Sequence, residues 1–479
     1  MNRATYITTA IPYVNARPHV GFALELVQAD VIARYHRLLN NTMWFQTGTD
    51  ENAFKNVLSA RDQKLTTQTL VDRNSHLFQE LAIALNISYD GFIRTTSIQH
   101  ERAVHEFWRQ LRKDDIYRHN YKGLYCTQCE DFYLERDLIN GRCPEHGTEP
   151  TEVQENNYFF RLSDYAERIN ELLKSGNIKI IPETRRNEVV SFVSRGLQDI
   201  SISRPYDRSG GWGIQVPDDP SQVVYVWIDA LINYLSGLGY GTTSNWTDFW
   251  NVDTLKIHVI GKNVWKFHAV YWPALLLSAG LALPDEIIVH GFLTEAGQKI
   301  SKSKGNAIDP FEVIREFGAD ALRYYLLRGA SPFGDSDFSI ERLKSLYNSD
   351  LANGLGNLIN RVTTLSQKAN CGRYYCSDIP SAPEDYHESL RQYNLDSSLK
   401  AIWAIVTRLN RDIDKKRPWE TLREGNTSSL QIQLGEWLRE IHRIAYWLGP
   451  FLPTACERIL GILSNDVIET QKALFPRLV

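Results

Sequence analysis

Hydrophobic and polar positions along the first part of the chain follow two periods. Residues 4–10 alternate and are rich in Thr, Tyr and Ile, which predicts a strand, and apolar positions from Val20 to Leu38 recur at helical spacing. A second strand is predicted over 42–47 and a second helix over 70–85. This order of strand, loop and helix is typical of a parallel α/β sheet.

The alternation stops near Ile116 and resumes near Val224. Residues 116–223 are richer in turn and β-forming residues, which indicates an inserted domain. Beyond them we expect strands over 224–227, 256–260 and 287–290 and an apolar helix over 265–280. From Glu341 the helical spacing is nearly continuous, with breaks at Gly372, 380–383 and Gly425, so a helical domain is expected to follow.

Size and composition set the outline of the domain organisation. A chain of 479 residues with 43% hydrophobic content suggests about three domains. We expect an α/β domain in two halves, 1–115 and 224–290, split by the insertion 116–223. A loop and contact region, 291–345, and a helical domain, 346–479, complete the expected order.

Charge and hydropathy limit the partners. The net charge is only −4, so any contact with nucleic acid must come from local basic patches. The sequence has no apolar run of 18 or more residues and no signal-peptide pattern at its start, which predicts a cytoplasmic protein with no membrane partner.

Three of the six cysteines stand in a spacing typical of metal sites. Cys126 and Cys129 form one Cys-x-x-Cys pair, and Cys143 and His146 form a Cys-x-x-His pair. Three thiolates and one imidazole can close a tetrahedral zinc site with no open position, which predicts a structural zinc. The alternative is three ordinary thiols beside a histidine by chance.

Two short motifs point to a nucleotide. His19 stands at the mouth of the predicted strand-to-helix turn and Gly21 follows, where an imidazole and helix-end N–H groups can meet phosphate. Alone, this pattern is more often a core or surface histidine. The segment 299–306 adds the ammonium and hydroxyl groups of Lys299, Ser301, Lys302, Ser303 and Lys304.

A lysine-rich run is often only a solvated loop. In this run Ser precedes Lys twice and Gly305-Asn306 follows, so it offers cations and donors that can follow charge onto leaving pyrophosphate. Because both motifs flank an interrupted α/β pattern, we favour an ATP site.

The two motifs resemble the signatures of class I aminoacyl-tRNA synthetases, usually written HIGH and KMSKS. From about Tyr6 to beyond Trp419 the chain resembles the methionyl-tRNA synthetases of the single-zinc-knuckle bacterial or organellar kind. The further matching segments are 8–15, 48–51, 157–160, 201–205, 227–230 and 354–361. The resemblance implies a Rossmann-type parallel-sheet catalytic domain split by a zinc-binding insertion, followed by an α-helical anticodon-binding domain.

The resemblance also implies roles for residues. ATP, carrying Mg²⁺, would be bound by His19, Gly21, Phe22, Lys299, Ser301, Lys302, Ser303 and Lys304, with His19, Lys299 and Lys302 catalytic. Methionine would be enclosed by Ala10, Ile11, Tyr13, Trp227, Ala230, Leu231, Tyr234, Phe267, His268 and Trp272, with Asp50 taking the α-ammonium. Aromatic and aliphatic walls suit a thioether, although Trp227, Tyr234 and Trp272 would otherwise read as core residues.

In the same family the CAU anticodon of tRNA(Met) is read by residues corresponding to Asn357, Arg361 and Trp419. An amide, a guanidinium and an indole suit unstacked bases. The alternative is an exposed amphipathic helix face. The short C-terminus predicts a monomer.

The chain departs from the family pattern at three places on the expected ATP side. Phe22 stands where HIGH ends in His, Asn52-Ala53 where the family has His-Gly, and Asn263 where it has Asp. The function we expect is methionine activation with ATP and transfer to tRNA. Two alternatives remain: a paralogue that delivers an amino acid to another acceptor, and a non-catalytic protein that binds tRNA or methionine.

Overall fold

The computed structural model describes residues 3–478 apart from 128, 134, 145–146, 296–297, 300–307, 373, 375–377 and 426. The chain divides into two compact units. The first comprises 1–18, 36–81 and 88–290, and the second comprises 19–35, 82–87 and 291–479. Helix α1 (Val20–Leu38) begins in the second unit and ends in the first, so the unit boundary runs through one continuous helix.

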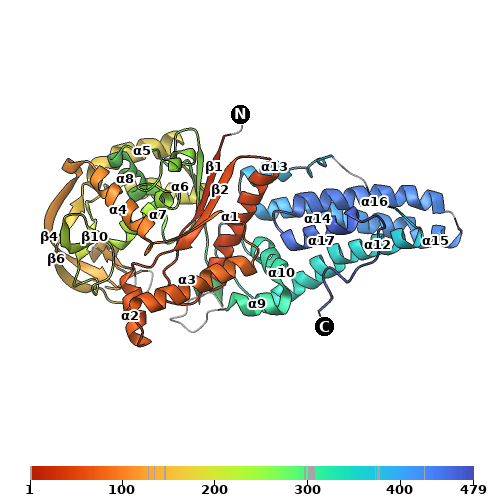
Figure 1. The fold of residues 1–479 in the computed structure, drawn as a ribbon, viewed down its shortest axis with the longest axis horizontal. Coiled ribbons are helices and arrows are strands. Elements are labelled where there is room, and N and C mark those ends of the chain that lie inside the picture. The colour runs from red at the N-terminus through yellow and green to blue at the C-terminus, as the bar shows by residue number, and fades with distance from the viewer. Residues whose placement is uncertain are drawn as a thin grey trace. The chain divides into compact units, whose positions relative to one another are not determined.

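The core of the first unit is a six-stranded parallel sheet in the order β3-β2-β1-β12-β13-β7, with β1 and β2 side by side (Figure 1). Every residue of β1 is buried, as expected of a central strand covered on both faces. The parallel α/β sheet predicted from the sequence is confirmed. The strands are β1 (Thr5–Thr9), β2 (Met43–Thr49), β3 (Gly91–Arg94), β7 (Lys179–Ile181), β12 (Leu255–Gly261) and β13 (Glu286–His290).

Helices connect the strands of this sheet. They are α2 (Phe54–Asp62), α3 (Thr67–Ala84), α4 (Ile98–Gln110), α5 (Ala166–Ser175), α6 (Glu183–Ser194), α7 (Val226–Ser236) and α8 (Trp272–Ala279). The strand predicted over 224–227 is wrong, because β11 (Asp219–Val224) ends there and α7 begins at Val226. Nearly every residue of α7 is buried, so its apolar start has no helical periodicity to distinguish it from a buried strand.

The helix predicted over 265–280 is present with one irregularity. It begins at Trp265, passes through a π-helical turn, Phe267–Tyr271, and continues as α8. Gly280 ends it in the left-handed conformation, with φ of 68°. A π-helical turn shifts the register of side chains, and such turns are frequent at functional sites.

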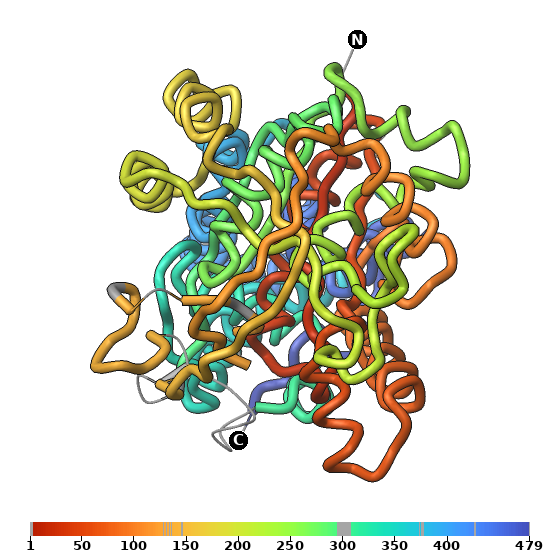
Figure 2. Tube along the Cα trace, turned by 90° about the vertical axis from the view of Figure 1, so that its left-hand side faces the viewer, coloured from red at the N-terminus to blue at the C-terminus, as the bar shows by residue number. Residues whose placement is uncertain are grey.

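The predicted insertion forms two smaller antiparallel sheets, β5-β4-β6-β8 and β10-β11-β9. Their strands, besides β11, are β4 (Ile116–Cys126), β5 (Asp131–Tyr133), β6 (Thr151–Phe160), β8 (Ile200–Ser201), β9 (Ser203–Pro205) and β10 (Gln215–Val216). The long strands β4 and β6 run together from the Ile116 and Phe160 pair to the Tyr125 and Thr151 pair (Figure 2). Strand β7 of the same stretch pairs with β13, so the insertion also supplies an edge strand of the central sheet.

The second unit is mainly helical, as predicted. Its helices beyond α1 are α9 (Pro310–Phe317), α10 (Ala319–Tyr324), α11 (Ile340–Leu346), α12 (Asn357–Lys368), α13 (Tyr386–Arg391), α14 (Leu395–Lys416), α15 (Pro418–Arg423), α16 (Thr427–Leu448) and α17 (Pro453–Ser464). A π-helical turn, Tyr347–Gly356, precedes α12. Helices α12, α14, α16 and α17 pack together (Figure 1). A small sheet contains β14 (Leu293–Glu295), β15 (Gln298–Lys299) and β16 (Ser336–Asp337).

A buried ion pair fixes α1 within the second unit. The Arg323 guanidinium, fully buried, lies 2.7 Å from the carboxylate of Asp30. The same guanidinium donates to the carbonyls of Leu85, Pro450 and Phe451. Through these contacts, this arginine holds the helix that follows His19 against the turn before α17.

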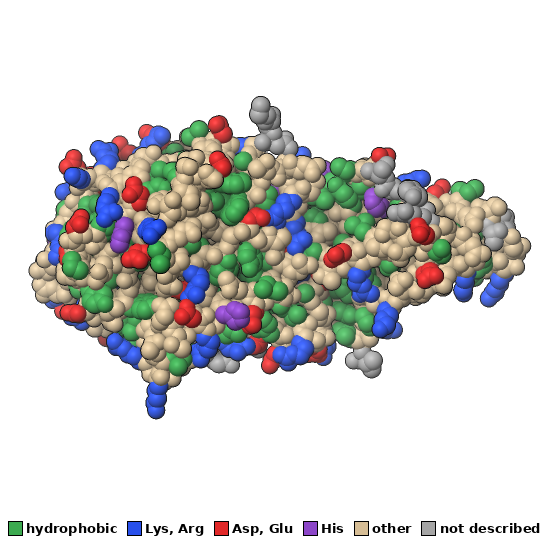
Figure 3. Space-filling view, viewed as in Figure 1, with side chains coloured by type: hydrophobic (Ala, Val, Ile, Leu, Met, Phe, Trp, Pro, Cys, Tyr) green, Lys and Arg blue, Asp and Glu red, His purple; other side chains and the backbone are tan. Residues whose placement is uncertain are grey.

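Surface charge agrees with the small net charge. On the face drawn in Figure 3, acidic and basic side chains are intermixed. Lys415, Lys416 and Arg417, at the end of α14, are exposed. Among the described helices, none has the length and apolarity to cross a membrane.

Candidate functional site

The carboxyl ends of β1 and β2 bring residues of the predicted methionine pocket together. Ala10 and Tyr13 follow β1, and Asp50 follows β2. The Asp50 N–H donates to the carbonyl of Pro12 at 2.9 Å, and Tyr13 forms a β-bridge with Asp50. The chain runs from β1 to β2 toward one edge of the sheet, and from β12 to β13 toward the other edge. The strand order therefore reverses between β1 and β12, and open α/β sheets bind ligands at such a point.

Asp50 is the most unusual group at this edge. It is 1% exposed, and its Oδ1 atom has no hydrogen-bond partner. Burial, reinforced by the carboxylates of Asp229 and Glu130, raises the pKa of Asp50 well above its ordinary value. The Tyr13 hydroxyl is likewise buried without a partner. Unsatisfied buried acceptors are costly, so this geometry favours a ligand that brings a donor or a cation.

An aromatic wall stands beside these groups. The Trp227 and Phe267 rings are stacked, with centroids 3.9 Å apart and planes 10° from parallel. The ring of Tyr13 lies 5.6 Å from that of Trp227. Trp227, Ala230, Leu231 and Tyr234 all come from α7, where spacings of three and four residues place them on one face. Ile11 is half-buried in the loop after β1.

A second pair of predicted residues forms one hydrogen-bonded unit. The Tyr234 hydroxyl lies 2.6 Å from Nε2 of His268, and Nδ1 of His268 lies 2.9 Å from the carbonyl of Val264. A carbonyl can only accept, so Nδ1 carries the proton and Nε2 accepts from Tyr234. Burial lowers the pKa of His268 to about 4, which keeps the ring neutral at physiological pH. Trp272 lies beside Tyr234, and its indole N–H is buried without a partner.

His258 is a buried polar group that the sequence analysis did not identify. Its ring lies 4.2 Å from that of Tyr234, and its Nδ1 is 2.6 Å from Thr8 Oγ1. Its Nε2 is buried with no hydrogen-bond partner. Burial lowers the pKa of His258 well below its ordinary value. A histidine between the apolar residues Ile257 and Val259 of a predicted strand was the signal available in the sequence.

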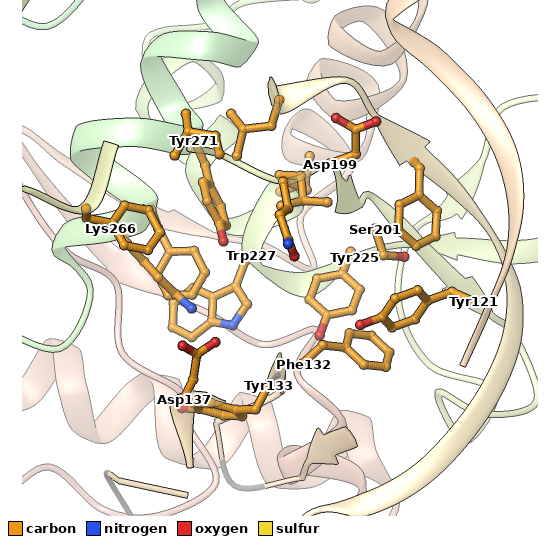
Figure 4. A pocket seen from close by; sticks show the side chains of 18 of the residues that line it. Tyr121, Phe132, Tyr133, Asp137, Asp199, Ser201, Tyr225, Trp227, Lys266 and Tyr271 are labelled. Atoms are coloured by element: carbon orange, nitrogen blue, oxygen red, sulfur yellow. The ribbon is translucent and has the colours of Figure 1, made fainter. Parts of the chain in front are cut away.

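A cavity of about 510 Å³ borders the aromatic wall on the side of the insertion. Tyr225, Tyr271 and Phe132 project toward it beside Trp227 (Figure 4). Two hydrogen bonds tie the wall to the cysteine-bearing segment. The Trp227 indole donates to the carbonyl of Cys129 at 3.3 Å, and the Tyr225 hydroxyl donates to that of Glu130 at 2.5 Å.

The structure brings the predicted cysteine ligands together. The Sγ atoms of Cys126, Cys129 and Cys143 all lie within 4.8 Å of one another. Sulfur ligands about 2.3 Å from a tetrahedral zinc lie about 3.8 Å apart, so the three thiols fit a metal ion. The Tyr133 hydroxyl donates to Cys129 Sγ at 3.1 Å. The fourth predicted ligand, His146, lies outside the described residues.

The first ATP motif lies at the start of α1, in the second unit. Nδ1 of His19 accepts a hydrogen bond from the Gly21 N–H at 3.1 Å. A side chain at position 21 would meet the His19 ring at 2.8 Å, which explains the glycine. Phe22 is 8% exposed, so at this position the chain presents a mostly buried ring.

The second ATP motif is described only at its borders. Lys299 ends β15, and nothing is described of its side chain; Ser301, Lys302, Ser303 and Lys304 lie outside the described residues. The Val20 N–H donates to the carbonyl of Ile308 at 3.3 Å, immediately after the undescribed loop. The backbone at the first motif therefore contacts the backbone just beyond the second.

The predicted anticodon residues also come together, on α12 and α15. The Arg361 guanidinium carbon lies 5.8 Å from the Trp419 ring centroid, and its Nη2 pairs with Asp414 Oδ1 at 2.6 Å. Asn357 and Arg361 line a cavity of about 340 Å³. Trp419 is 37% exposed, which is unusual for so large an apolar side chain.

Comparison with known proteins agrees with this geometry. The family model described as "tRNA synthetases class I (M)" matches residues 5–154 and 136–363. A methionine–tRNA ligase of Brucella suis is 40% identical over 487 residues, covering 98% of this chain and 93% of its own. One of Fusobacterium nucleatum is 38% identical over 483 residues, covering 97% of this chain and 75% of its own.

Solved structures extend the likeness to the fold. A crystal structure of Mycobacterium tuberculosis methionyl-tRNA synthetase bound by methionyl-adenylate has a TM-score of 0.91 at 36% identity, and covers 99% of this chain and 100% of its own. The chain belongs to the class I tRNA synthetases, in the methionine branch of that family. This membership supports the ligase interpretation over that of a paralogue with another acceptor.

Proposed function

We propose that this chain is an ATP-dependent methionine–tRNA ligase. It joins methionine and ATP to give methionyl-adenylate and pyrophosphate, and then transfers the methionyl group to the terminal ribose of tRNA(Met). The observation that carries the proposal is the buried, unpartnered Oδ1 of Asp50 beside the aromatic wall. It fits an amino acid that brings an ammonium and an apolar side chain to the same edge of the sheet.

In the first step, Asp50 accepts hydrogen bonds from the α-ammonium. Trp227 and Phe267 offer flat aromatic surface to the thioether, which makes favourable contacts with ring edges. The neutral His268 and the hydroxyl of Tyr234 lie at the same α7 face. Ala10, Ile11, Tyr13, Ala230, Leu231 and Trp272 complete the proposed enclosure.

The chemistry requires no protein nucleophile. The methionine carboxylate attacks the α-phosphorus, and negative charge grows on the departing pyrophosphate. His19 and the loop with Lys299, Ser301, Lys302, Ser303 and Lys304 are proposed to bind phosphate, with Mg²⁺ carried by ATP. The Val20 to Ile308 contact supports a shared role for the two motifs. Gly21 admits the His19 ring, and Phe22 packs at the helix start.

For tRNA, Asn357, Arg361 and Trp419 are proposed to read the anticodon. Stacking on an indole and hydrogen bonds from an amide and a guanidinium suit single-stranded bases. Asp414 pairs with Arg361 in the structure, so a base must compete for that guanidinium.

The cysteine cluster is proposed to hold one structural zinc with His146 as the fourth ligand. Such a zinc would stabilise the segment whose carbonyls accept from Trp227 and Tyr225. The bounds of the five expected segments, the cytoplasmic location and the monomeric state stay predictions.

Two measurements test the function. Methionine-dependent exchange between ATP and pyrophosphate reports activation alone, and charging of initiator tRNA(Met) reports both steps. We expect both activities from the purified chain. Exchange without charging would favour another acceptor, and the absence of both would favour a binding protein.

A further inference from the structure

Three other buried carboxylates act on Asp50, the proposed ammonium ligand. Asp50, Glu51, Glu130 and Asp229 are each at most 2% exposed. All three neighbours raise the pKa of Asp50 through their charge, in addition to burial. Buried charges of one sign are costly unless each finds a partner, so the partners decide which carboxylate is available to a ligand.

Two of the four have local partners. The Arg94 guanidinium donates to both carboxylate oxygens of Glu51, at 2.7 and 2.9 Å. Glu130 Oε1 accepts from the backbone N–H of Lys55 at 2.8 Å. Within the described chain, Asp50 Oδ1 is the one buried oxygen of these four carboxylates that lacks a hydrogen-bond partner.

Asp229 receives one donor on each oxygen. The Asn52 amide donates to Oδ2 at 2.7 Å, and Nε2 of His100 lies 2.6 Å from Oδ1. The second hydrogen of the Asn52 amide is used by the carbonyl of Thr95, at 3.1 Å. The amide orientation is therefore determined by two acceptors.

His100 is fully buried, and its other nitrogen is also engaged. Nδ1 lies 2.7 Å from the hydroxyl oxygen of Ser236, and that hydroxyl donates to the carbonyl of Asn233 at 3.3 Å. An ionised carboxylate only accepts, so Nε2 of His100 carries the proton that is donated to Asp229.

We propose that Asn52 and His100 are positioning residues for the substrate ammonium. Their hydrogen bonds compensate the negative charge of Asp229 and direct its carboxylate away from Asp50. Oδ1 of Asp50 then stays free for the methionine ammonium. Without these donors, the two buried carboxylates would share a proton, and that hydrogen bond would occupy the oxygen the ammonium needs. The inference rests on the proposed function and deepens it.

This assignment gives Asn52 a role on the methionine side. Asn52 is one of the three departures from the family pattern on the expected ATP side. Its amide instead donates to Asp229, and both Asn and the His of the family pattern are N–H donors. A donor at this position is therefore the property the network needs.

The test compares ligands that share the methionine side chain. Methioninol keeps the ammonium and lacks the carboxylate, whereas 4-(methylsulfanyl)butanoate keeps the carboxylate and lacks the ammonium. Titration calorimetry on the full chain measures both. Asn52→Leu and His100→Leu remove the donors, and Asn52→His and His100→Gln retain an N–H donor.

We expect each Leu variant to bind methioninol at least about tenfold more weakly, with less than a twofold change for the ligand without the ammonium. The donor-retaining variants should recover most of the affinity. If a Leu variant does not fold, as judged by its melting temperature, the comparison at the other position carries the test.

If the Leu variants bind both ligands equally more weakly, or bind methioninol as tightly as the wild type does, the positioning role alone is overturned. Failure of both donor-retaining variants to recover affinity would overturn it too. A wild-type chain that binds neither methioninol nor methionine would overturn the proposed function, and this inference with it.

Discussion

The two predicted recognition sites differ most in their exposure to water. In the first unit, Asp50 is 1% exposed and lies among buried aromatic rings. In the second unit, Trp419 is 37% exposed, and Arg361 pairs with the exposed Asp414. A small ligand can be enclosed by side chains that replace its hydration shell. A large polyanion such as tRNA instead contacts side chains that remain exposed to solvent.

The difference has energetic consequences. A charge interaction in a buried site is strengthened by the low dielectric, but an unpaired charge there destabilises the empty protein. Exposed groups cost the folded protein little and contribute through stacking and phosphate contacts. We therefore expect changes in the first unit to alter stability and affinity together, and changes at Trp419 to alter tRNA use alone.

The largest effect should come from removing the proposed zinc. Cys143→Ser should lose bound zinc and lower the melting temperature strongly, because structural zinc binding is worth about 10 kcal/mol or more in zinc-finger peptides. Elemental analysis and calorimetry measure this. Cys371→Ser, in the second unit, is the matched control and should keep the metal. Full zinc content and an unchanged melting temperature in Cys143→Ser would contradict the site.

The next effect separates affinity from stability at Asp50. Asp50→Asn should weaken methionine binding by about 10²–10⁴-fold, since removing one partner of a buried ion pair costs about 3–5 kcal/mol. The same change should stabilise the empty protein at pH 7. Asp62→Asn, on the exposed end of α2, serves as control and should change neither property.

The sign of that stabilisation follows from the raised pKa of Asp50. Below the ordinary carboxyl pKa, Asp50 is protonated in both the folded and the unfolded state and costs nothing. As pH rises from that ordinary pKa to the raised folded-state pKa, Asp50 ionises in the unfolded chain but keeps its proton in the folded protein, so the folded protein loses stability. The gain in melting temperature from Asp50→Asn should thus vanish near pH 4 and grow toward neutral pH; a gain independent of pH would contradict burial of the charge.

Changes in the lysine loop should affect the activation step, which ATP–pyrophosphate exchange measures without tRNA. Lys302→Ala should lower ATP–pyrophosphate exchange by about 10²-fold or more, because a lost transition-state donor costs about 3 kcal/mol. Phe22→His should change exchange much less, since Phe22 is mostly buried and backbone N–H groups remain at the helix start. If Phe22→His is the more damaging change, the loop has been given the wrong role.

The smallest effect is expected at the exposed site. Trp419→Ala should remove a base stack worth about 1–3 kcal/mol and reduce charging about tenfold, with methionine activation unchanged. Trp419→Phe keeps an aromatic face and should retain most of the charging. Equal loss of both activities in Trp419→Ala would mean that the indole supports the fold instead of the anticodon.

Much of the fold could be predicted from local patterns. The alternation over 4–10 became β1, and the helical spacing from Val20 became α1 with the same bounds. The strand predicted over 224–227 failed because α7 is buried on all sides and carries no amphipathic period. Periodicity reports the contrast between two faces, so it is silent where both faces are buried.

Candidate residues were predictable to the extent that they stood in short motifs. The cysteine pair spacing led to three thiols that lie together, and the family motifs led to Asn357, Arg361 and Trp419. His258 and His100 belong to no such motif and were not identified. Each is a single histidine whose partners come from distant segments.

The sequence by itself determined the order of strands and helices, the cysteine spacing and the resemblance to a synthetase family. These properties depend on neighbours along the chain. Only the tertiary structure decided that Asn52 donates to Asp229, 177 residues away, and that Oδ1 of Asp50 is left as the unpartnered carboxylate oxygen. Burial and pairing of charges depend on which distant segments contact one another, and local sequence patterns do not predict those tertiary contacts.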